Sequence, residues 1–438
     1  MRRTHLCRVF SVGAVAAMSV LLFSFSSYAA SYMKFCAQWT RTYTDAGYGE
    51  DYFTSSALNV QTGAYRARYA IRVGSMGSEP IQTGFLDGVG CMPTTITITP
   101  NTTYYFTQMT WAERDTRAAW VNTDTGTSFN NTVNALTSSY TTGASLTNGY
   151  TYTHTFSTVW ASPKANLMPI IGHMLNTYYL YAMPSNFYTV FRTDIDACEF
   201  DGAYYSGSGH ICVVENGNIY SWGDMTTWKF AIAHEFGHRI ADATDGPYPD
   251  GYEEDTDTEE PDEKCTCDHI GGYGSDLHCL QSREKAVTAQ GEGFAHFVAT
   301  AAMNARVEND GRFVYPKPEF IYSGGWTTTG PPSPTNAYQV LPESNSDRWM
   351  EKYCPPGDIS RGVELDWLRF YYEIWTTGTY KFSTQDIVDV WDDVTDDEFG
   401  WDNNAGSILP TVEAQWGAGT SKTNLFEDKG LQAGVDHG

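Results

Sequence analysis

The chain has 438 residues, with 27 basic and 52 acidic side chains and a formal net charge of −25. A surface this acidic repels nucleic acid and anionic membranes, so we expect neither as a partner. With 41% hydrophobic and 15% aromatic residues, the chain can bury large cores. This composition excludes an intrinsically disordered protein, and the length fits about two domains.

Residues 1–30 predict a secretory signal peptide. Arginines at positions 2, 3 and 8 precede an apolar run over residues 9–23, and small residues follow where a signal peptidase reads the chain. The run is too short to span a membrane, and no later stretch of the sequence is long and apolar enough. We therefore expect an exported protein with no transmembrane anchor, secreted to the exterior or alternatively periplasmic.

Eight cysteines remain once Cys7, which belongs to the predicted signal peptide, is set aside. An even number in an oxidising compartment predicts four disulfide bonds. Proximity along the chain favours the pairs Cys36–Cys91 and Cys198–Cys212. Two further bonds would then join the remaining four residues, Cys265, Cys267, Cys279 and Cys354.

Residues 31–155 are expected to form an all-β, sandwich-like domain. Residues 65–73 place apolar side chains at odd positions and arginine at most even ones, which is typical of a half-buried antiparallel strand. Segments 94–99, 104–111 and 150–156 continue this pattern between turn residues. Segment 123–149, rich in Thr, Ser, Asn and Gly, is expected to be a long loop or linker. Strand propensity explains the many aromatic residues and threonines, and a carbohydrate- or protein-binding face is the alternative.

Residues 156–438 are expected to form a second domain with helices and strands. A helix over residues 163–183, a strand over 187–191 and a hairpin over 203–214 lead to a helix over 228–241. Thr226 or Asp224 is expected to cap that last helix at its N-terminus.

The helix over 228–241 contains His234-Glu235-Phe236-Gly237-His238. Histidines four residues apart project from one side of a helix, so His234 and His238 can converge on a single cation, and tetrahedral zinc suits this geometry. Glu235 lies about 100° round the helix from His234 and can serve as general base toward a metal-bound water. The alternative is a helix whose histidines make hydrogen bonds in the core.

A catalytic zinc needs a third protein ligand, and the segment Gly291-Glu292-Gly293-Phe294-Ala295 offers a glutamate. Together the two segments resemble the zincin metallopeptidases, and among them the gluzincins. The second segment is similar to the Asn-Glu-Gly-Phe-Ala signature of aminopeptidase-type gluzincins. This resemblance implies that Glu292 joins His234 and His238 as a zinc ligand and that Glu235 is the base.

The same resemblance implies that the strand over residues 210–214 forms a sheet edge to which the substrate backbone binds. His296, one turn beyond Glu292, is the alternative third ligand. His238 and Glu292 are separated by 53 residues, which is more than thermolysin-like and aminopeptidase-like enzymes have. We therefore expect an insertion at about residues 245–281.

The insertion begins with nine acidic residues among positions 250–263, a run that is typical of a solvated loop. Clustered carboxylates also suit a hard cation, so a calcium site is the alternative. Farther along, the insertion carries Cys265, Cys267, His269, His278 and Cys279. In an exported chain these cysteines favour disulfides over a second, structural zinc site.

The C-terminal part predicts a second ligand helix over residues 282–306, a buried helix over 363–375 and a further helix over 384–394. The tail from Asp428 is expected to be loose. Asp366 is a candidate to orient the histidine ligands. The oxyanion of the transition state also needs a hydrogen-bond donor. One candidate, His296, could alternatively support the metal ligands from outside. The candidates are His296, Tyr322, Tyr338, Tyr371 and Tyr372.

The sequence thus predicts a multidomain protein with an N-terminal all-β domain and an α+β zincin-like catalytic domain. The expected function is that of a secreted zinc-dependent metallopeptidase, which uses Glu235 to assist attack on peptide bonds of a peptide or protein substrate. Zn²⁺ is the expected cofactor, with Ca²⁺ as a further alternative. Two other functions remain open: a non-proteolytic zincin-fold surface or binding protein, and a β-domain adhesin whose second domain is only a scaffold.

Overall fold

A computed structural model gives the fold of the chain. It describes residues 30–41, 43, 45, 60–121, 135–158, 163–177, 183–184, 186–193, 198, 203–207, 209–214, 225–245, 280, 284–304, 306, 312–313, 338–339, 361–395 and 405–435. The predicted signal peptide, except its last residue, lies outside these residues, and so does the predicted insertion at 245–281, except residues 245 and 280.

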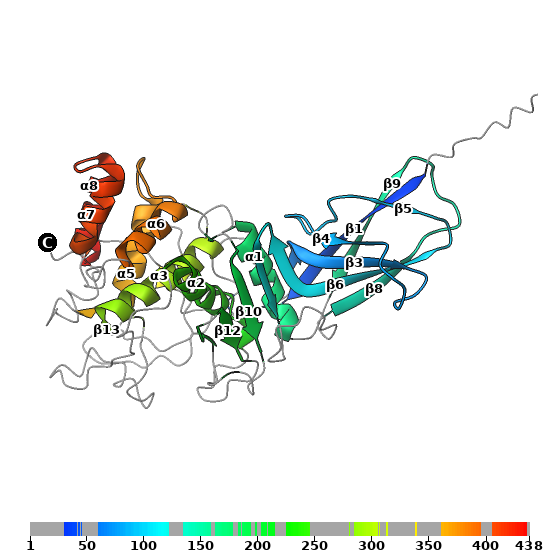
Figure 1. The fold of residues 1–438 in the computed structure, drawn as a ribbon, viewed down its shortest axis with the longest axis horizontal. Helices are drawn as coiled ribbons and strands as arrows, with labels where there is room; N and C mark the ends of the chain where they lie inside the picture. Colours follow the sequence, from blue (N-terminus) through cyan, green and yellow to red (C-terminus); the bar gives the residue numbers. More distant parts are fainter. Residues whose placement is uncertain are drawn as a thin grey trace, which may run out of the picture.

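The architecture is mixed, with strands gathered at one end of the molecule and helices at the other (Figure 1). This agrees with the broad prediction of β structure followed by a part that combines helices and strands. Helices α2 (Lys229–Asp245) and α3 (Ala286–Met303), which carry the predicted ligands, lie between the strands and the C-terminal helices. The sandwich and zincin-like assignments remain predictions.

The first sheet is built around β1 (Ser31–Arg41), which pairs antiparallel with β2 (Val60–Gly63) and β5 (Ile96–Ile98). Its fourth strand, β9 (Thr151–Thr158), pairs with β1 in parallel. Strands from both ends of the predicted β-domain are therefore neighbours in this sheet.

The second sheet runs in the order β11-β12-β10-β7-β6-β3-β4, and β8 also pairs with β6. Its strands are β3 (Ala67–Val73), β4 (Gln82–Phe85), β6 (Thr103–Arg114), β7 (Arg117–Val121), β8 (Ala135–Thr141), β10 (Tyr188–Arg192), β11 (Ala203–Tyr205) and β12 (His210–Val213). β3 confirms the strand predicted from alternation, with Ala67, Tyr69 and Ile71 buried.

Aromatic side chains of the two sheets share one core. Phe35 and Phe156 of the first sheet lie 5.9 Å and 5.2 Å, between ring centroids, from Phe106 of the second. Tyr69 of the second sheet also stacks on Phe106, with ring centroids 5.9 Å apart. The packing explains why inward-facing aromatic residues recur along these strands.

Three sequence predictions about elements are wrong. Segment 123–149 contains strand β8, because the threonines and serines that favoured a loop also tolerate an exposed strand beside β6. The strand over 210–214 is not a sheet edge, because β12 pairs in parallel with β10 and antiparallel with β11. Residues 428–433 of the tail are not loose, because they belong to helix α8 (Ser421–Ala433).

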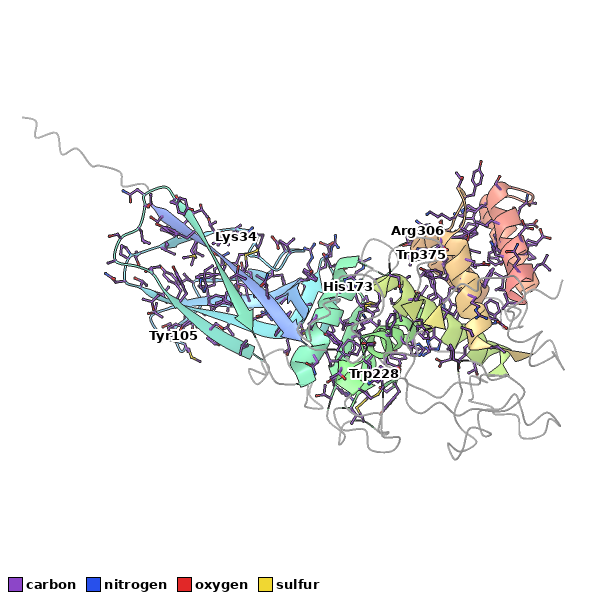
Figure 2. All side chains as sticks on the ribbon, turned by 180° about the vertical axis from the view of Figure 1, so that it is seen from behind. Lys34, Tyr105, His173, Trp228, Arg306 and Trp375 are labelled. Carbon is purple, nitrogen blue, oxygen red and sulfur yellow. A yellow bond between two sulfur atoms is a disulfide. The ribbon has the colours of Figure 1, made fainter. Side chains whose placement is uncertain are left out.

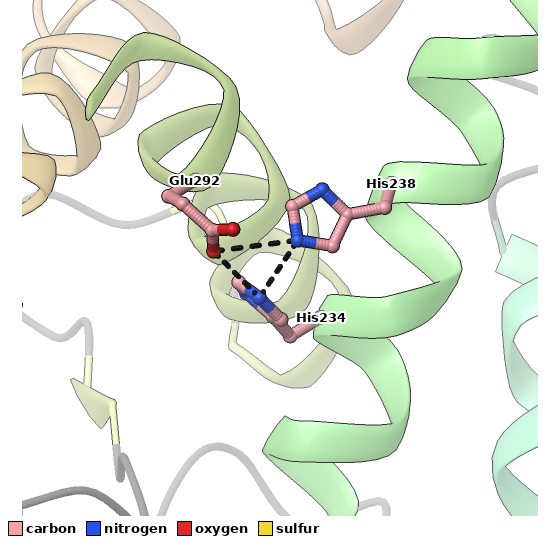
Figure 3. Close-up of side chains that lie close together, drawn as sticks. All are labelled: His234, His238 and Glu292. Atoms are coloured by element: carbon pink, nitrogen blue, oxygen red, sulfur yellow. Dashed lines mark hydrogen bonds and ion pairs between the residues drawn. The ribbon is translucent and has the colours of Figure 1, made fainter. Parts of the chain in front are cut away.

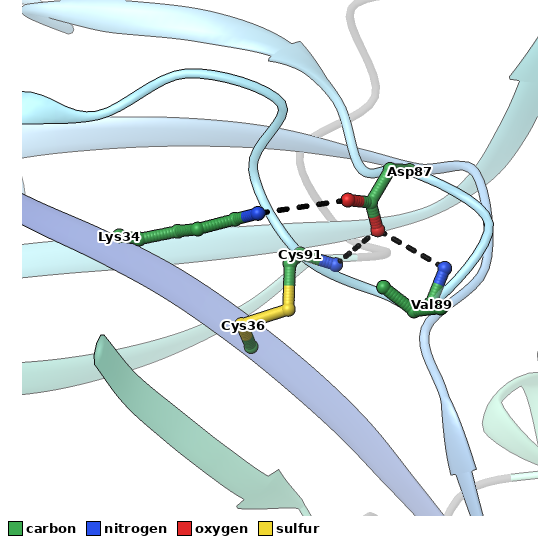
Figure 4. The surroundings of a disulfide bond; sticks show 5 residues. All are labelled: Lys34, Cys36, Asp87, Val89 and Cys91. Atoms are coloured by element: carbon green, nitrogen blue, oxygen red, sulfur yellow. Dashed lines mark hydrogen bonds and ion pairs between the residues drawn. A yellow bond between two sulfur atoms is a disulfide. The ribbon is translucent and has the colours of Figure 1, made fainter.

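Both disulfide bonds that fall in the described part of the chain, Cys36–Cys91 and Cys198–Cys212, were predicted and are present. The first ties β1 to the loop after β4, as Figure 4 shows. In that loop Asp87 accepts hydrogen bonds from the backbone N–H groups of Val89 and Cys91, and its other oxygen lies 3.8 Å from Lys34 Nζ on β1. The other four cysteines outside the predicted signal peptide lie beyond the described residues.

Seven helices are described, and contacts between them join α1 to the helices farther along the chain. They are α1 (Pro163–Thr177), α2, α3, α5 (Glu364–Thr376), α6 (Thr384–Thr395), α7 (Ala405–Trp416) and α8, with a 3-10 turn η4 (Met225–Thr227) before α2. His173 of α1 contacts the carbonyl of Ala302 on α3 at 2.6 Å, and Arg306 binds the carbonyl of Trp375 on α5 at 2.7 Å (Figure 2). These contacts join α1, α3 and α5.

Two short ladders complete the fold: β13 (Glu284–Lys285) pairs with β16 (Arg361–Gly362), and β14 (Arg312–Phe313) pairs with β15 (Tyr338–Gln339). The first ladder places the start of α3 beside the start of α5. None of the helices in the described part of the chain is long and apolar enough to cross a membrane.

The second sheet spans the predicted domain boundary near residue 156. β7, which precedes the boundary, pairs in parallel with β10, which follows it, over residues 118–121 and 188–191. The division into domains 31–155 and 156–438 stays a prediction, and any such domains would share this sheet.

Candidate metal centre

Helix α2 is held at its N-terminus by a carboxylate from a distant part of the chain. Asp45 accepts hydrogen bonds from the backbone N–H groups of Lys229 at 3.1 Å and Phe230 at 3.0 Å, across 184 residues of sequence in the first case. Thr226, one of the two predicted caps, lies instead in η4, where its hydroxyl accepts a hydrogen bond from Asn166. Asp224, the other predicted cap, lies outside the described residues.

Asp45 and Lys229 are both fully buried, so each charge is costly to hold without the other. Burial raises the pKa of the Asp45 carboxyl, and the Lys229 charge and the backbone N–H groups oppose that shift. Burial likewise lowers the pKa of Lys229, opposed by Asp45. The negative cap also interacts favourably with the N-terminal end of the helix dipole.

The last turns of α2 are fixed against the second sheet. Arg239 donates to the backbone carbonyl of Tyr188 on β10 at 3.2 Å and pairs with Asp242 at 2.9 Å. Tyr205 of β11 donates to the same Asp242 carboxylate. The helix that carries the two histidines is thus anchored at both ends.

Two glycines bring α2, α3 and α5 close together. A Cβ on Gly237 of α2 would lie 2.8 Å from Cα of Ala295 on α3, nearer than side-chain carbons approach. A Cβ on Gly293 of α3 would lie 3.0 Å from the backbone oxygen of Glu364 on α5 and would overlap Cβ of Trp367. Any larger residue at either position would push the helices apart. Because the three helices lie this close together, side chains from all of them can meet.

The three predicted metal ligands meet between α2 and α3 (Figure 3). His234 Nε2 lies 3.0 Å and His238 Nε2 lies 3.3 Å from the same oxygen, Oε2 of Glu292. The two imidazole nitrogens are 3.0 Å apart. All three side chains are buried.

This triangle suits a small divalent cation. Zinc with ligand distances of about 2.0–2.1 Å in a tetrahedron separates its ligand atoms by roughly 3.3–3.4 Å. The observed separations of 3.0–3.3 Å fall close to that value. Two imidazoles and one carboxylate are also a ligand set found in catalytic zinc sites. The residues are therefore positioned to bind a metal ion. The ligand types and their separations favour zinc, which stays a prediction.

The electrostatics of His234 favour metal binding. Burial lowers the pKa of the His234 imidazole well below its usual value of 6.5, and the neighbouring His296 and His238 rings lower it further. Hydrogen bonding and the charge of Glu292 oppose this shift without reversing it. His234 is therefore neutral at pH 7, which is the form that binds a metal.

Glu235, the predicted base, is next to His234 on α2 and is 7% exposed. It does not belong to the group formed by His234, His238 and Glu292, whose ligand atoms all lie within 4.8 Å of one another. Its role as the base stays a prediction.

His296 packs against His234, one of the predicted metal ligands. Its ring centroid is 4.2 Å from that of His234, and its Nε2 lies 2.9 Å from Oε2 of Glu364. Both His296 and Glu364 are fully buried. Sequence reasoning missed Glu364, because a single glutamate at the start of an apolar helix carries no spacing signal. The two residues are 68 positions apart.

The other candidates fall into two groups. Tyr371 and Tyr372 are buried; Tyr371 packs against Phe294 and Phe297 of α3, and burial raises its pKa. Asp366 is buried and lies 3.8 Å from Arg369, so its role in orienting the histidines stays a prediction. The remaining candidates lie outside the described side chains: Tyr322, Tyr338, the acidic run at 250–263, and the Cys and His residues of the insertion.

Comparison with known proteins adds no family assignment. The sequence matches no family model and no curated protein. The resemblance to gluzincins therefore rests on the two short segments that meet in this site.

Proposed function

We propose that this protein is an exported, zinc-dependent peptidase of gluzincin type. The observation that carries the proposal is the meeting of His234, His238 and Glu292, which come from two helices far apart in sequence. Two disulfide bonds support export, because such bonds persist in oxidising compartments.

His234, His238 and Glu292 would hold the ion. When bound, zinc lowers the pKa of a water molecule toward 7 and polarises the scissile carbonyl. Glu235 would accept the proton of the attacking water and pass it to the nitrogen of the leaving amine. Burial lowers the pKa of His234, so its imidazole is neutral at pH 7 and in the form that binds a metal.

A peptide substrate would bind along the edge of the second sheet. Among the described strands, β11 lies at the end of the strand order, antiparallel to β12 and connected to α2 through Tyr205 and Asp242. An extended peptide can pair with an exposed edge strand through its backbone. Such pairing would lay the substrate along the helix that carries the base.

Three of the candidate oxyanion donors have described side chains. His296, Tyr371 and Tyr372 are buried within the helical layer, which favours support of the ligands over contact with a substrate. For His296, contact with the His234 ring gives this supporting role a direct physical basis.

The test is to measure casein or peptide-library cleavage and zinc content in wild type and in Glu235→Gln, each with and without a chelator. We expect the variant to keep its zinc and to lose cleavage by about 100-fold or more, because a general base contributes roughly 100- to 10,000-fold to the rate. Chelation should abolish cleavage by the wild type.

Equal cleavage by wild type and Glu235→Gln would refute the proposed role of Glu235. Zinc bound at the site with no cleavage in either protein, over a broad peptide library, would favour the alternative of a non-proteolytic surface or binding protein.

A further inference from the structure

A second group of buried potential metal ligands adjoins the first. Within the described residues, two groups of three side chains are placed to hold an ion: His234, His238 and Glu292, and then Glu292, His296 and Glu364. The ligand atoms of the second group also lie within 4.8 Å of one another. Glu292 belongs to both groups.

From these contacts we propose that the protein binds a second divalent transition-metal ion between Glu292, His296 and Glu364, with the Glu292 carboxylate shared between the two ions. One imidazole and two carboxylates form a ligand set that suits zinc and neighbouring divalent metals. The proposal concerns metal binding alone and holds whether or not the protein cleaves peptides.

The geometry of the second group resembles that of the first. His296 Nε2 and Glu364 Oε2 are 2.9 Å apart, close to the 3.0 Å between His234 Nε2 and Glu292 Oε2. Both imidazoles of the first group approach Oε2 of Glu292 (Figure 3). A carboxylate has a second oxygen with lone pairs of its own, so it can bind an ion on each side.

The two groups adjoin each other. The His234 and His296 rings, one from each group, have centroids 4.2 Å apart and are tilted by 36°. Because Glu292 belongs to both groups, the two ions would be neighbours on one carboxylate, as in protein sites that hold two metals about 3.5–4 Å apart.

Two carboxylates of the second group lie close together in a buried place. Glu364 is fully buried and Glu292 is 3% exposed, and their ligand oxygens lie within 4.8 Å of each other. Two ionised carboxylates this close repel each other when water is excluded. An ion held by the second group would contact both carboxylates and offset this repulsion.

The fold holds these ligands on short, fixed elements. Glu292 and His296 are one turn apart on α3, and Glu364 is the first residue of α5. Gly293 lets the two helices approach closely, because any side chain there would meet the backbone of Glu364. The ladder between β13 and β16 fixes the starts of both helices together.

The test compares the zinc content of full-length wild type and Glu364→Gln after equilibration with Zn²⁺ and removal of free metal. We expect the wild type to hold one zinc more per chain than Glu364→Gln. Glu364→Gln keeps the size of the side chain but removes its charge. Glu373→Gln, a carboxylate farther along α5 that pairs with Lys429 and belongs to neither ligand group, is the matched control and should keep the wild-type count.

The difference is decisive even if the cysteines of the insertion bind a further zinc, because such an ion would raise both counts equally. The zinc that remains at the first group in Glu364→Gln should disappear on adding His238→Ala. In the wild type loaded with Co²⁺, two ions sharing a carboxylate should show magnetic coupling by electron paramagnetic resonance.

Equal zinc content in the wild type and Glu364→Gln would overturn the proposal and leave His296 and Glu364 as a hydrogen-bonded pair. Loss of the zinc held by His234 and His238 in Glu364→Gln would also overturn it, as would equal losses in Glu364→Gln and Glu373→Gln. If Glu364→Gln does not fold, the Co²⁺ measurement on the wild type decides, and uncoupled ions refute a shared Glu292.

Discussion

Gly237→Ala tests whether the close contact of α2 and α3 sets the geometry of the metal ligands. A Cβ at this position would lie 2.8 Å from Ala295 Cα, 3.0 Å from its backbone oxygen and 3.1 Å from Val298 Cβ. Carbon atoms pack favourably at about 3.5–4.0 Å, so α3 must move away by at least about half an ångström. Backbone atoms cannot avoid the new group by a change of rotamer.

Glu292 lies three residues before Ala295 on the same helix, so its carboxylate would move with α3. Metal sites tolerate errors of about 0.2 Å in ligand distance. We therefore expect zinc affinity to fall by about 10- to 100-fold, equivalent to roughly 1.4–2.8 kcal/mol. Overpacking should also cost the metal-free protein about 1–3 kcal/mol, partly offset by about 1 kcal/mol from the helix preference of alanine.

The assay is competition for Zn²⁺ with a chromophoric chelator, together with urea unfolding of the metal-free proteins. Gly77→Ala is the control, because a Cβ there meets no atom within 4 Å. It should leave both zinc affinity and stability unchanged. Wild-type zinc affinity in a folded Gly237→Ala protein would refute the argument that this contact positions Glu292.

Two further predictions concern buried ionisable groups outside the ligand set. Burial lowers the pKa of His173 from 6.5 to about 4, so the unfolded chain binds more protons than the folded chain between these values, and stability is lost as pH falls through this range. The wild type should lose roughly 2 kcal/mol more than His173→Gln between pH 7 and pH 5 in urea unfolding, and parallel losses would contradict this pKa. Asp45→Asn should lower the unfolding free energy at pH 7 by roughly 3 kcal/mol, because it leaves the buried Lys229 charge without its counter-charge. Adding Lys229→Met should recover part of that loss in a double-mutant cycle, and additive losses would show that the two charges do not interact.

Local periodicity predicted much of the fold. The strand β3 followed from alternating arginines, and α2, α3, α5 and α6 followed from apolar residues at helical spacing. The three residues that meet in the candidate metal centre were also chosen from sequence. That was achievable because two ligands share one turn of a helix and the third lies in a recognisable segment.

Features that depend on contacts between distant segments were not predicted. Glu364 reaches His296 only because Gly293 lets α5 pack closely on α3, and the residues around Glu364 give no sign of this. Asp45 caps α2 from a segment with no pattern of its own. The edge strand is β11 and not β12, because the order of strands depends on how the whole sheet pairs and not on the sequence of a single strand.

The parallel pairing of β7 with β10 has a consequence for how the chain acquires its structure. A fragment that began at residue 156 would keep β12 beside β10 but would lack β7, its other partner, and the carboxylate that caps α2. The open side of β10 would offer hydrogen-bonding groups to other chains, which is a route to aggregation. We therefore expect the residues from 156 onward to need the strands before them in order to fold without aggregating.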